Sequence, residues 1–242
     1  TAIVVILFNQ SQNRKRADKA KSTFLANMSH DIRTPMNAII GMTAIAFKHL
    51  DDPGQVKKCL NRIESSSRYL LGLINDVLDM SKIESGKMTL HNEYVPLPEV
   101  ISRMITIVQP SIKSKKQKFS IQLHHVEHEH ICTDSLRLSQ VFINILDNAI
   151  KYSAPGGRIT VKLWAGEYKA FIELIDQGRG IPPEDLENVK TKFYKGSNSV
   201  RGSGIGLALV DSIMTALDGT MDIKSTLGRG TVVTLGLPLY KK

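Results

Sequence analysis

Apolar residues recur at alternating three- and four-residue intervals in two long stretches of the chain. The first stretch runs from Leu25 to Ala46 and the second from Leu60 to Ser81. This heptad spacing predicts two helices, each with an apolar stripe, and an Asp-Asp-Pro-Gly turn signal at 51–54 separates them. We therefore predict an antiparallel helical hairpin. Because one hairpin alone would leave much of its apolar surface in water, we expect two copies to pair as a dimeric four-helix bundle.

The pattern changes after Gly86, where shorter helical and strand patterns are mixed. Helical spacing appears over 99–112, 135–152 and 205–217. Strand-like alternation appears over 119–123, 158–164, 169–175, 220–225 and 230–237. The mixture lacks a strand–helix–strand rhythm, which predicts an α+β fold with helices on one face of a sheet, an α/β sandwich. The expected boundaries are a leading segment at 1–13, the hairpin at 14–91 and the sandwich at 92–242.

The chain begins with a short apolar run, Ala2–Phe8, and a basic cluster follows at 14–16. A run of this length cannot cross a bilayer, which needs about 20 residues. The end of a spanning helix, followed by basic residues on the cytoplasmic side, would have this pattern. We interpret 1–13 as the end of a transmembrane helix and juxtamembrane segment, so the chain would be the soluble cytoplasmic part of a protein anchored in the inner membrane. A soluble helix with an apolar first turn is the alternative.

The composition narrows the class of protein. Apolar residues make up 42% and charged residues 23% of the chain, which is typical of a soluble globular protein. The net charge of +9 suits nucleic acid, anionic lipid or a phosphate-rich ligand. No basic stripe is interleaved with aromatic residues, which argues against nucleic acid. Cys59 and Cys132 match no metal-binding spacing and are interpreted as reduced thiols.

The most informative histidine lies in the segment 24–41, Phe-Leu-Ala-Asn-Met-Ser-His-Asp-Ile-Arg-Thr-Pro-Met-Asn-Ala-Ile-Ile-Gly. His30 and Thr34 are four residues apart and share one helix face, and Asp31 follows His30 directly. An imidazole can attack phosphorus when one nitrogen is free and the other faces an acceptor, which Asp31 can supply. Pro35 removes a helix hydrogen bond and permits a bend. For a lone histidine, a solvated helix position would be the alternative.

The predicted helix at 135–152 carries a polar stripe. Asn144, Asn148 and Lys151 recur at i, i+4 and i+7, and apolar residues cover the opposite face. An amide oxygen suits Mg²⁺, a hard cation that bridges to substrate phosphates, and a lysine on the same face suits the phosphates themselves. Solvated asparagines are the alternative for this stripe taken alone.

Two glycine-rich boxes follow this helix. In the first, a carboxylate after a predicted strand can accept from an exocyclic amine such as that of adenine. In the second, glycines before a predicted helix let backbone N–H groups approach an anion. The second box lacks the G-x-G-x-x-G spacing after a strand, so a Rossmann interpretation fails. The residues are Asp176, Gly178 and Gly180 in the first box, and Gly202, Gly204, Gly206 and Leu207 in the second.

In their order and spacing, these segments resemble the sensor histidine kinases of two-component systems, from about Lys15 to the C-terminus. The resemblance implies a dimerisation and phosphotransfer domain at 14–91 and a Bergerat-type catalytic ATP-binding domain at 92–242. It implies a homodimeric kinase that uses ATP and Mg²⁺ to phosphorylate itself and then an aspartate of a response regulator. The continuation at 36–42 resembles hybrid kinases in particular.

The resemblance assigns roles to the hairpin residues. His30 is the expected phosphoacceptor, and Asp31 is its base or orienting partner. Thr34 lies one helical turn beyond His30, and families with Thr at this position are often phosphatases of their regulators as well. Its hydroxyl would align a water for attack on phosphorus. The alternative is that Thr34 only eases the backbone before Pro35.

The resemblance also assigns roles in the second domain. Asn148 is the expected Mg²⁺ ligand, and Asp176 is the expected adenine-reading carboxylate. The other residues expected to contact ATP or to shape its pocket and lid are Asn144, Lys151, Tyr152, Gly178, Gly180, Lys195, Gly202, Gly204, Gly206 and Leu207.

Two positions depart from the family pattern around the aromatic box at 193–195. Lys190 stands where an aromatic residue is usual, and Lys195 stands where the box usually ends in Arg. The first departure predicts a looser lid, and the second exchanges a bidentate phosphate fork for a point charge. Neither removes a group that the chemistry needs, so we predict an active enzyme in preference to a pseudokinase scaffold. The hairpin with its histidine argues against a gyrase-like or chaperone ATPase.

A histidine-rich stretch is not explained by the resemblance. His124, His125, His128 and His130 flank a predicted turn between two strands, a composition that can bind metal. No cysteine joins them, and the family has no metal there. We interpret the stretch as a solvated hairpin.

Overall fold

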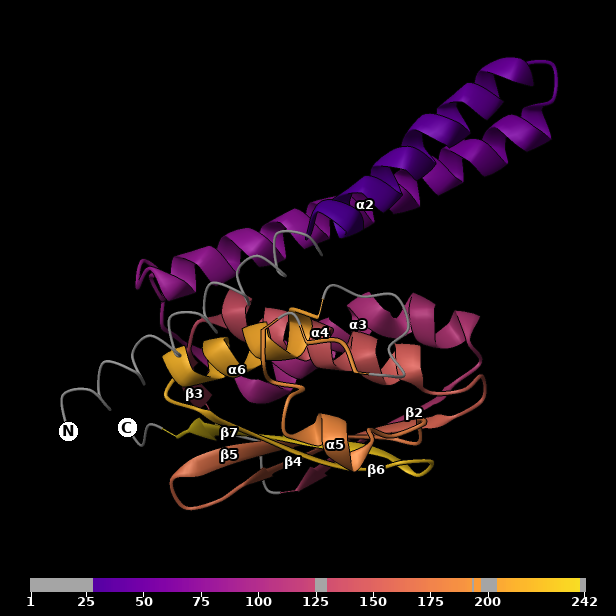
Figure 1. Ribbon diagram of the computed structural model, residues 1–242. Helices are drawn as coiled ribbons and strands as arrows, with labels where there is room; N and C mark the ends of the chain where they lie inside the picture. The colour runs from indigo at the N-terminus through magenta and orange to yellow at the C-terminus, as the bar shows by residue number, and fades with distance from the viewer. Residues whose placement is uncertain (1–27, 125–129, 193, 197–203, 240–242) are drawn as a thin grey trace, which may run out of the picture. The chain divides into compact units, whose positions relative to one another are not determined.

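The structure is a computed structural model that describes residues 28–124, 130–192, 194–196 and 204–239. The chain divides into two compact units, Thr1–Leu78 and Asp79–Lys242. The first is helical, and the second combines helices with β-sheet (Figure 1). The predicted hairpin followed by an α/β sandwich is therefore confirmed.

The hairpin begins with a helix over 28–48, and α2 (Pro53–Glu84) follows after a short turn. Asp52 caps α2, because its Oδ1 accepts a hydrogen bond from the backbone N–H of Gln55 at 3.0 Å. Cys59 and Leu73 of α2 are buried. Several large apolar side chains of the two helices nevertheless stay exposed: Met36, Ile40, Phe47, Leu60, Leu71, Ile74 and Leu78. The hairpin thus keeps the unburied apolar surface that the heptad pattern predicts.

A five-stranded sheet organises the second unit, in the order β2-β4-β5-β7-β6. All neighbouring pairs are antiparallel except β2 and β4, which are parallel. The strands are β2 (Lys118–His124), β4 (Arg158–Ala165), β5 (Lys169–Asp176), β6 (Thr220–Thr226) and β7 (Gly230–Pro238). A separate two-stranded sheet pairs β1 (Glu93–Pro96) with β3 (His130–Thr133). The sequence pattern did not predict this small sheet. The prediction that the strands on either side of the histidine-rich stretch form a hairpin is wrong, because β2 pairs with β4 and β3 pairs with β1.

Three helices lie on one face of the five-stranded sheet: α3 (Leu97–Ser114), α4 (Ser135–Tyr152) and α6 (Gly206–Ala216) (Figure 1). A short α5 (Pro183–Leu186) follows β5. The core lies between helices and sheet, where Phe142, Ile145, Leu163 and Ile172 are almost completely buried. This burial explains the one-sided apolar pattern of α4.

Both ends of α4 are fixed by side chains from other segments. At the start, Asp134 accepts from the backbone N–H of Arg137 at 3.0 Å, as an N-cap, and also from the backbone N–H of His91 at 3.0 Å. At the end, Lys115 Nζ donates to the carbonyls of Ile150 at 2.7 Å and Lys151 at 3.0 Å. These bonds satisfy carbonyls that a helix end leaves without partners. The polar face of α4 is thereby held in one position.

The membrane prediction is not tested by the described residues. None of the helices within 28–124, 130–192 and 204–239 is long and apolar enough to cross a bilayer. The predicted end of a transmembrane helix, 1–13, lies outside the described residues.

Candidate active site

His30 lies on the first helix with its side chain 80% exposed. Its Nδ1 is 3.5 Å from Oδ1 of Asp31, whose side chain is only 13% exposed. A fixed carboxylate near Nδ1 favours the proton on that nitrogen and leaves Nε2 with its lone pair directed outward. The pair therefore has the arrangement that a nucleophilic imidazole needs.

Thr34 is exposed one turn further along the same helix face. Its Oγ1 donates to the backbone carbonyl of His30 at 3.0 Å. The next residue, Pro35, has no N–H to donate to the helix ladder and is buried. The hydroxyl is thus close to the backbone of His30, and it has a local structural partner.

The polar face of α4 meets the start of α6 in the second unit. Asn144, Asn148 and Lys151 are all half-buried. A Cβ built on Gly206, the first residue of α6, would lie 3.5 Å from Oδ1 of Asn144. Two motifs that are about sixty residues apart in sequence are thus adjacent. Leu207, the second residue of α6, is half-buried.

Tyr152, at the end of α4, lies against the first glycine box. Its carbonyl accepts from the backbone N–H of Arg179 at 3.3 Å. The Arg179 guanidinium carbon is 4.6 Å from the centre of the Tyr152 ring, and Lys151 Nζ is 4.8 Å from it. Both cations therefore interact with the ring π-system. We had not predicted a role for Arg179; its only signal in the sequence is its position between two glycines of the box.

Asp176 ends β5 and is the carboxylate of the first glycine box. Its Oδ1 accepts from the backbone N–H groups of Gly178 at 2.8 Å and Thr231 at 3.3 Å. Burial raises the pKa of this carboxyl, and the two backbone donors lower it by less. Both hydrogen bonds that the described residues make to Asp176 go to Oδ1, so Oδ2 can accept a hydrogen bond from a ligand.

Gly178 and Gly180 permit the close packing around this carboxylate. A Cβ on Gly178 would lie 2.7 Å from Oδ1 of Asp176 and 2.9 Å from the carbonyl oxygen of Tyr152. Gly180 has φ +70°, and its Cβ would lie 2.1 Å from the carbonyl oxygen of Thr226. Any side chain at either position would force backbone atoms apart.

The segment that contains the aromatic box is attached to the sandwich at two described points. Lys190 Nζ donates to the Met221 carbonyl at 2.6 Å and pairs with Asp211 at 3.1 Å. Tyr194 donates to Oδ1 of the buried Asp185 at 2.5 Å, which raises the pKa of Tyr194. The expected looseness does not apply to Lys190 itself, because the lysine has polar partners on α6 and β6.

For the remaining predicted residues, the structure gives only the exposure or the backbone conformation, or the residue lies outside the described ranges. Lys195 is exposed, and Gly204 has φ +71° before α6. Gly202 lies outside the described residues, as do His125 and His128. Among the described residues no three His, Cys, Asp or Glu side chains gather to hold a metal ion.

Two family matches cover the two units. The family described as "His Kinase A (phospho-acceptor) domain" matches residues 20–86. The family described as "Histidine kinase-, DNA gyrase B-, and HSP90-like ATPase" matches residues 133–241. The first match includes His30, and the second includes the α4 stripe and both glycine boxes.

Curated relatives align over nearly the whole chain. The non-motile and phage-resistance protein of Caulobacter vibrioides is 39% identical over 241 residues, which is 92% of this chain and 28% of that protein. The sensor histidine kinase YclK of Bacillus subtilis is 32% identical over 233 residues, 94% of this chain and 49% of that protein. The chain thus spans about a quarter to a half of the length of these relatives.

Solved structures share the fold. A mycobacterial sensor histidine kinase, MprB, is 30% identical with a TM-score of 0.55, over 63% of this chain and 100% of that chain. The histidine kinase ThkA, in complex with the response regulator protein TrrA, is 23% identical with a TM-score of 0.68, over 97% of this chain and 67% of that chain. The second likeness concerns the fold alone.

Proposed function

The chain belongs to the sensor histidine kinases of two-component systems, and we propose that it uses Mg-ATP to phosphorylate His30 and then passes the phosphoryl group to an aspartate of a response regulator. The observation that carries the proposal is that the polar stripe of α4 lies next to both glycine boxes within the sandwich. In addition, the chain has an exposed histidine beside a carboxylate. We propose the division at 14–91 and 92–242 for these two tasks.

In the proposed nucleotide site, Asp176 accepts a hydrogen bond from the exocyclic amine of adenine through Oδ2. The Tyr152 ring, with Arg179 and Lys151 beside it, packs against the base. The backbone before α6, at Gly204 and Gly206, lies close to the phosphates, because the start of a helix offers free N–H groups to an anion. Asn144 and Lys151 then face the phosphate chain from α4.

A magnesium ion fits the donor set of this site. Asn148 is half-buried on the polar face of α4, one turn beyond Asn144, and its amide oxygen is a hard ligand of the kind Mg²⁺ accepts. When bound, the ion supplies charge neutralisation between the phosphates. Asn148 is the residue of this chain that would hold the ion.

In the transfer step, Nε2 of His30 forms a bond to the γ-phosphorus while the bond from that phosphorus to the bridging oxygen of ADP breaks. Asp31 holds the Nδ1–H and stabilises the positive charge that develops on the ring. In the second step, the carboxylate of the regulator's aspartate takes the phosphoryl group and the imidazole is restored. Both steps depend on alignment more than on proton transfer.

Radiolabelling from γ-labelled ATP tests the proposal. We expect an acid-labile, base-stable phosphoprotein from the wild-type chain and none from His30→Gln, with nucleotide binding unchanged, because acceptor and pocket lie in separate units. Asn148→Asp should lower labelling by about a hundredfold or more, since it places a negative charge beside the phosphates. Label that persists in His30→Gln would refute the assignment of the acceptor.

The oligomeric state of the chain and its location in the cell are also proposals. The exposed apolar side chains of the hairpin support a homodimer whose two hairpins bury them together. The apolar run at 2–8 and the basic residues at 14–16 support a membrane anchor, with the chain on the cytoplasmic face of the cell membrane. Cell fractionation of the protein expressed from its complete gene would test the anchor, and a protein found wholly outside the membrane fraction would contradict it.

A further inference from the structure

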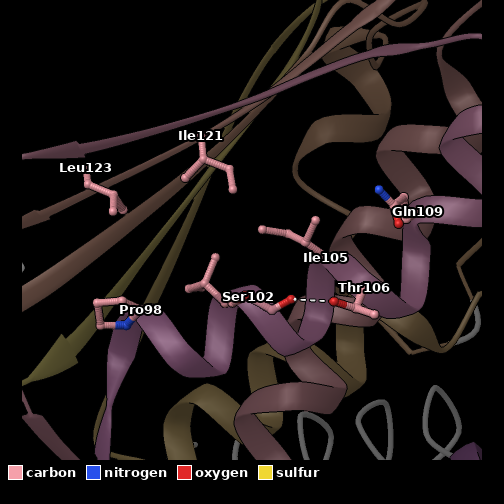
Figure 2. Close-up of a pocket in the computed structure, with 8 residues that line it drawn as sticks. Pro98, Ser102, Ile105, Thr106, Gln109, Ile121 and Leu123 are labelled. Atoms are coloured by element: carbon pink, nitrogen blue, oxygen red, sulfur yellow. Dashed lines mark hydrogen bonds between the residues drawn. The ribbon is translucent and has the colours of Figure 1, made fainter.

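An apolar groove lies along the β2 edge of the five-stranded sheet, formed by residues with no role in the proposed nucleotide site. Figure 2 shows Ile121 and Leu123 of β2 directed toward α3, where Ile105 and Thr106 lie opposite. The open groove has a volume of about 260 Å³. Its apolar lining includes Ile101, Ile105, Ile121 and Leu123. We call this surface the β2 groove.

The two edges of the sheet differ in how the chain covers them. At the β6 edge, Lys190 Nζ donates to the Met221 carbonyl at 2.6 Å, and the Ile181 N–H donates to Oγ of Ser225 at 2.9 Å. The chain's own loop therefore occupies that edge. At the opposite edge, β2 pairs with β4 and with no other strand that the structure describes. Alternate backbone N–H and C=O groups of β2 consequently face outward.

The centre of β2 lacks the features that usually protect an edge strand. Natural edges carry a central charge, a proline or a bulge that prevents a further strand from pairing. The five central residues of β2, at 119–123, are Phe-Ser-Ile-Gln-Leu, with no charge and no proline. Ile121 is 42% exposed and Leu123 is 49% exposed. The edge is thus apolar and open to strand pairing.

The surroundings of the β2 groove are strongly basic. Lys113 lies one helical turn beyond Gln109 on the groove face of α3, and Lys116 and Lys118 lie where the chain turns into β2. Arg103 adds a further positive charge to α3, whose only acidic residue is Glu99. An acidic partner is therefore favoured over a basic one.

We propose that the β2 groove binds an extended, acidic peptide segment of a partner protein. The segment adds to the sheet as a further strand, and its backbone pairs with the outward groups of β2. Apolar side chains at alternate positions enter the groove, because successive side chains of a strand point to opposite faces. Acidic residues at its ends face Lys113 and Lys118.

Fluorescence anisotropy with a defined probe tests this proposal on the full chain. The probe is a fluorescein-labelled Asp-Glu-Val-Thr-Val-Ser-Val-Glu-Asp peptide, compared with a peptide in which lysines replace the four acids. We expect saturable binding of the acidic peptide that weakens with added salt, and binding of the lysine peptide that is at least about tenfold weaker. Equal affinity for both peptides, or no binding of either, would overturn the proposal.

Matched variants locate the binding surface. Ile121→Glu places a charge in the groove and should weaken the acidic peptide at least about tenfold. The control Leu136→Glu changes a side chain that is 71% exposed at the start of α4 and should leave peptide binding unchanged. Because both side chains are exposed, unfolding temperature and ATP binding should match the wild type. Lys113→Glu, on the surface of α3, should weaken the binding of the acidic peptide and leaves the apolar lining of the groove unchanged.

Two results would refute the site. ATP binding shows whether Ile121→Glu and Lys113→Glu are folded. If both folded variants bind the acidic peptide as tightly as the wild type does, the peptide does not bind in the β2 groove. If light scattering shows that the wild-type chain assembles beyond a dimer and that Ile121→Glu abolishes this assembly, the occupant is a second copy of the chain and the peptide proposal fails.

Discussion

The hairpin and the sandwich bury apolar surface in different ways. In the hairpin, Ile40 is 62% exposed, Phe47 70% and Leu71 60%. In the sandwich, Leu163 and Ile172 are completely buried. The sandwich therefore has its own core, whereas the hairpin leaves apolar side chains exposed, which the proposed dimer would cover. The proposed functional residues differ in the same way: the histidine is exposed on the hairpin, and the residues proposed to bind the nucleotide from α4 are half-buried in the sandwich.

The largest expected effect is on assembly. Leu71→Glu should convert the dimer to a monomer at micromolar concentration, because a charge would have to be buried between hairpins. ATP binding by the sandwich should stay unchanged. Light scattering gives the mass, and Leu136→Glu, an equally polar change on the exposed surface of the sandwich, serves as the control. A dimer that survives Leu71→Glu would mean that this part of the stripe is not the interface.

A substitution in the sandwich should have the opposite effect: it should lower the stability of the sandwich and leave the hairpin unchanged. Gly180→Ala should destabilise the sandwich by about 2–4 kcal/mol and weaken ATP binding, because a Cβ would overlap the Thr226 carbonyl and φ is positive. Gly228→Ala is the matched control, since φ there is +79° but nothing lies within 4 Å of the new Cβ; its cost should be about 1 kcal/mol. Urea unfolding of both variants, with ATP titration, measures the difference. Equal costs would show that backbone strain alone, and not the contact with Thr226, restricts Gly180.

Asp176 should give the stability of the sandwich a pH dependence. Burial raises the pKa of Asp176 in the folded chain, so its contribution to stability is present at low pH and is lost as the pH rises through the folded pKa. The ionised carboxylate is the better acceptor for adenine, so adenosine affinity should rise as the pH rises through the raised pKa of Asp176. Asp176→Asn should bind adenosine more weakly and lose this part of the pH dependence. Parallel pH profiles of wild type and variant, by calorimetry, would contradict the assignment.

The smallest effect concerns the exposed face of the hairpin. Thr34→Ala should keep autophosphorylation and slow the dephosphorylation of the phosphorylated regulator severalfold, if the hydroxyl aligns a water there. The bond from Thr34 to the His30 carbonyl supplies the competing structural role. Decay of regulator phosphate, with wild-type and variant chain, measures the effect. Equal decay rates would leave Thr34 with the structural role alone.

Much of the fold could be predicted from local sequence patterns, because each of these patterns is compatible with only one type of helix, strand or turn. The one-sided apolar spacing of 135–152 predicted α4 with the observed bounds. The turn at 51–54 predicted where the hairpin reverses, and Asp52 supplies the cap. The sheet formed by β1 and β3 was missed, because Glu93–Pro96 is short, ends in proline and has its partner more than thirty residues away. Nothing local in such a segment distinguishes a strand from a linker.

The residue types of the site were evident in the sequence, and their partners were not. The sequence by itself determined the proposed nucleophile with its neighbouring carboxylate, the polar stripe of α4 and the glycine boxes, because helix spacing and the absence of a Cβ act within a few residues. Only the tertiary structure decided that Arg179 lies over Tyr152 and that Lys190 pairs with Asp211. It also decided that Lys190 contacts β6, while β2 has no second neighbouring strand among the described residues. Those contacts join segments that are distant along the chain, and they form only when the core brings helices and sheet together.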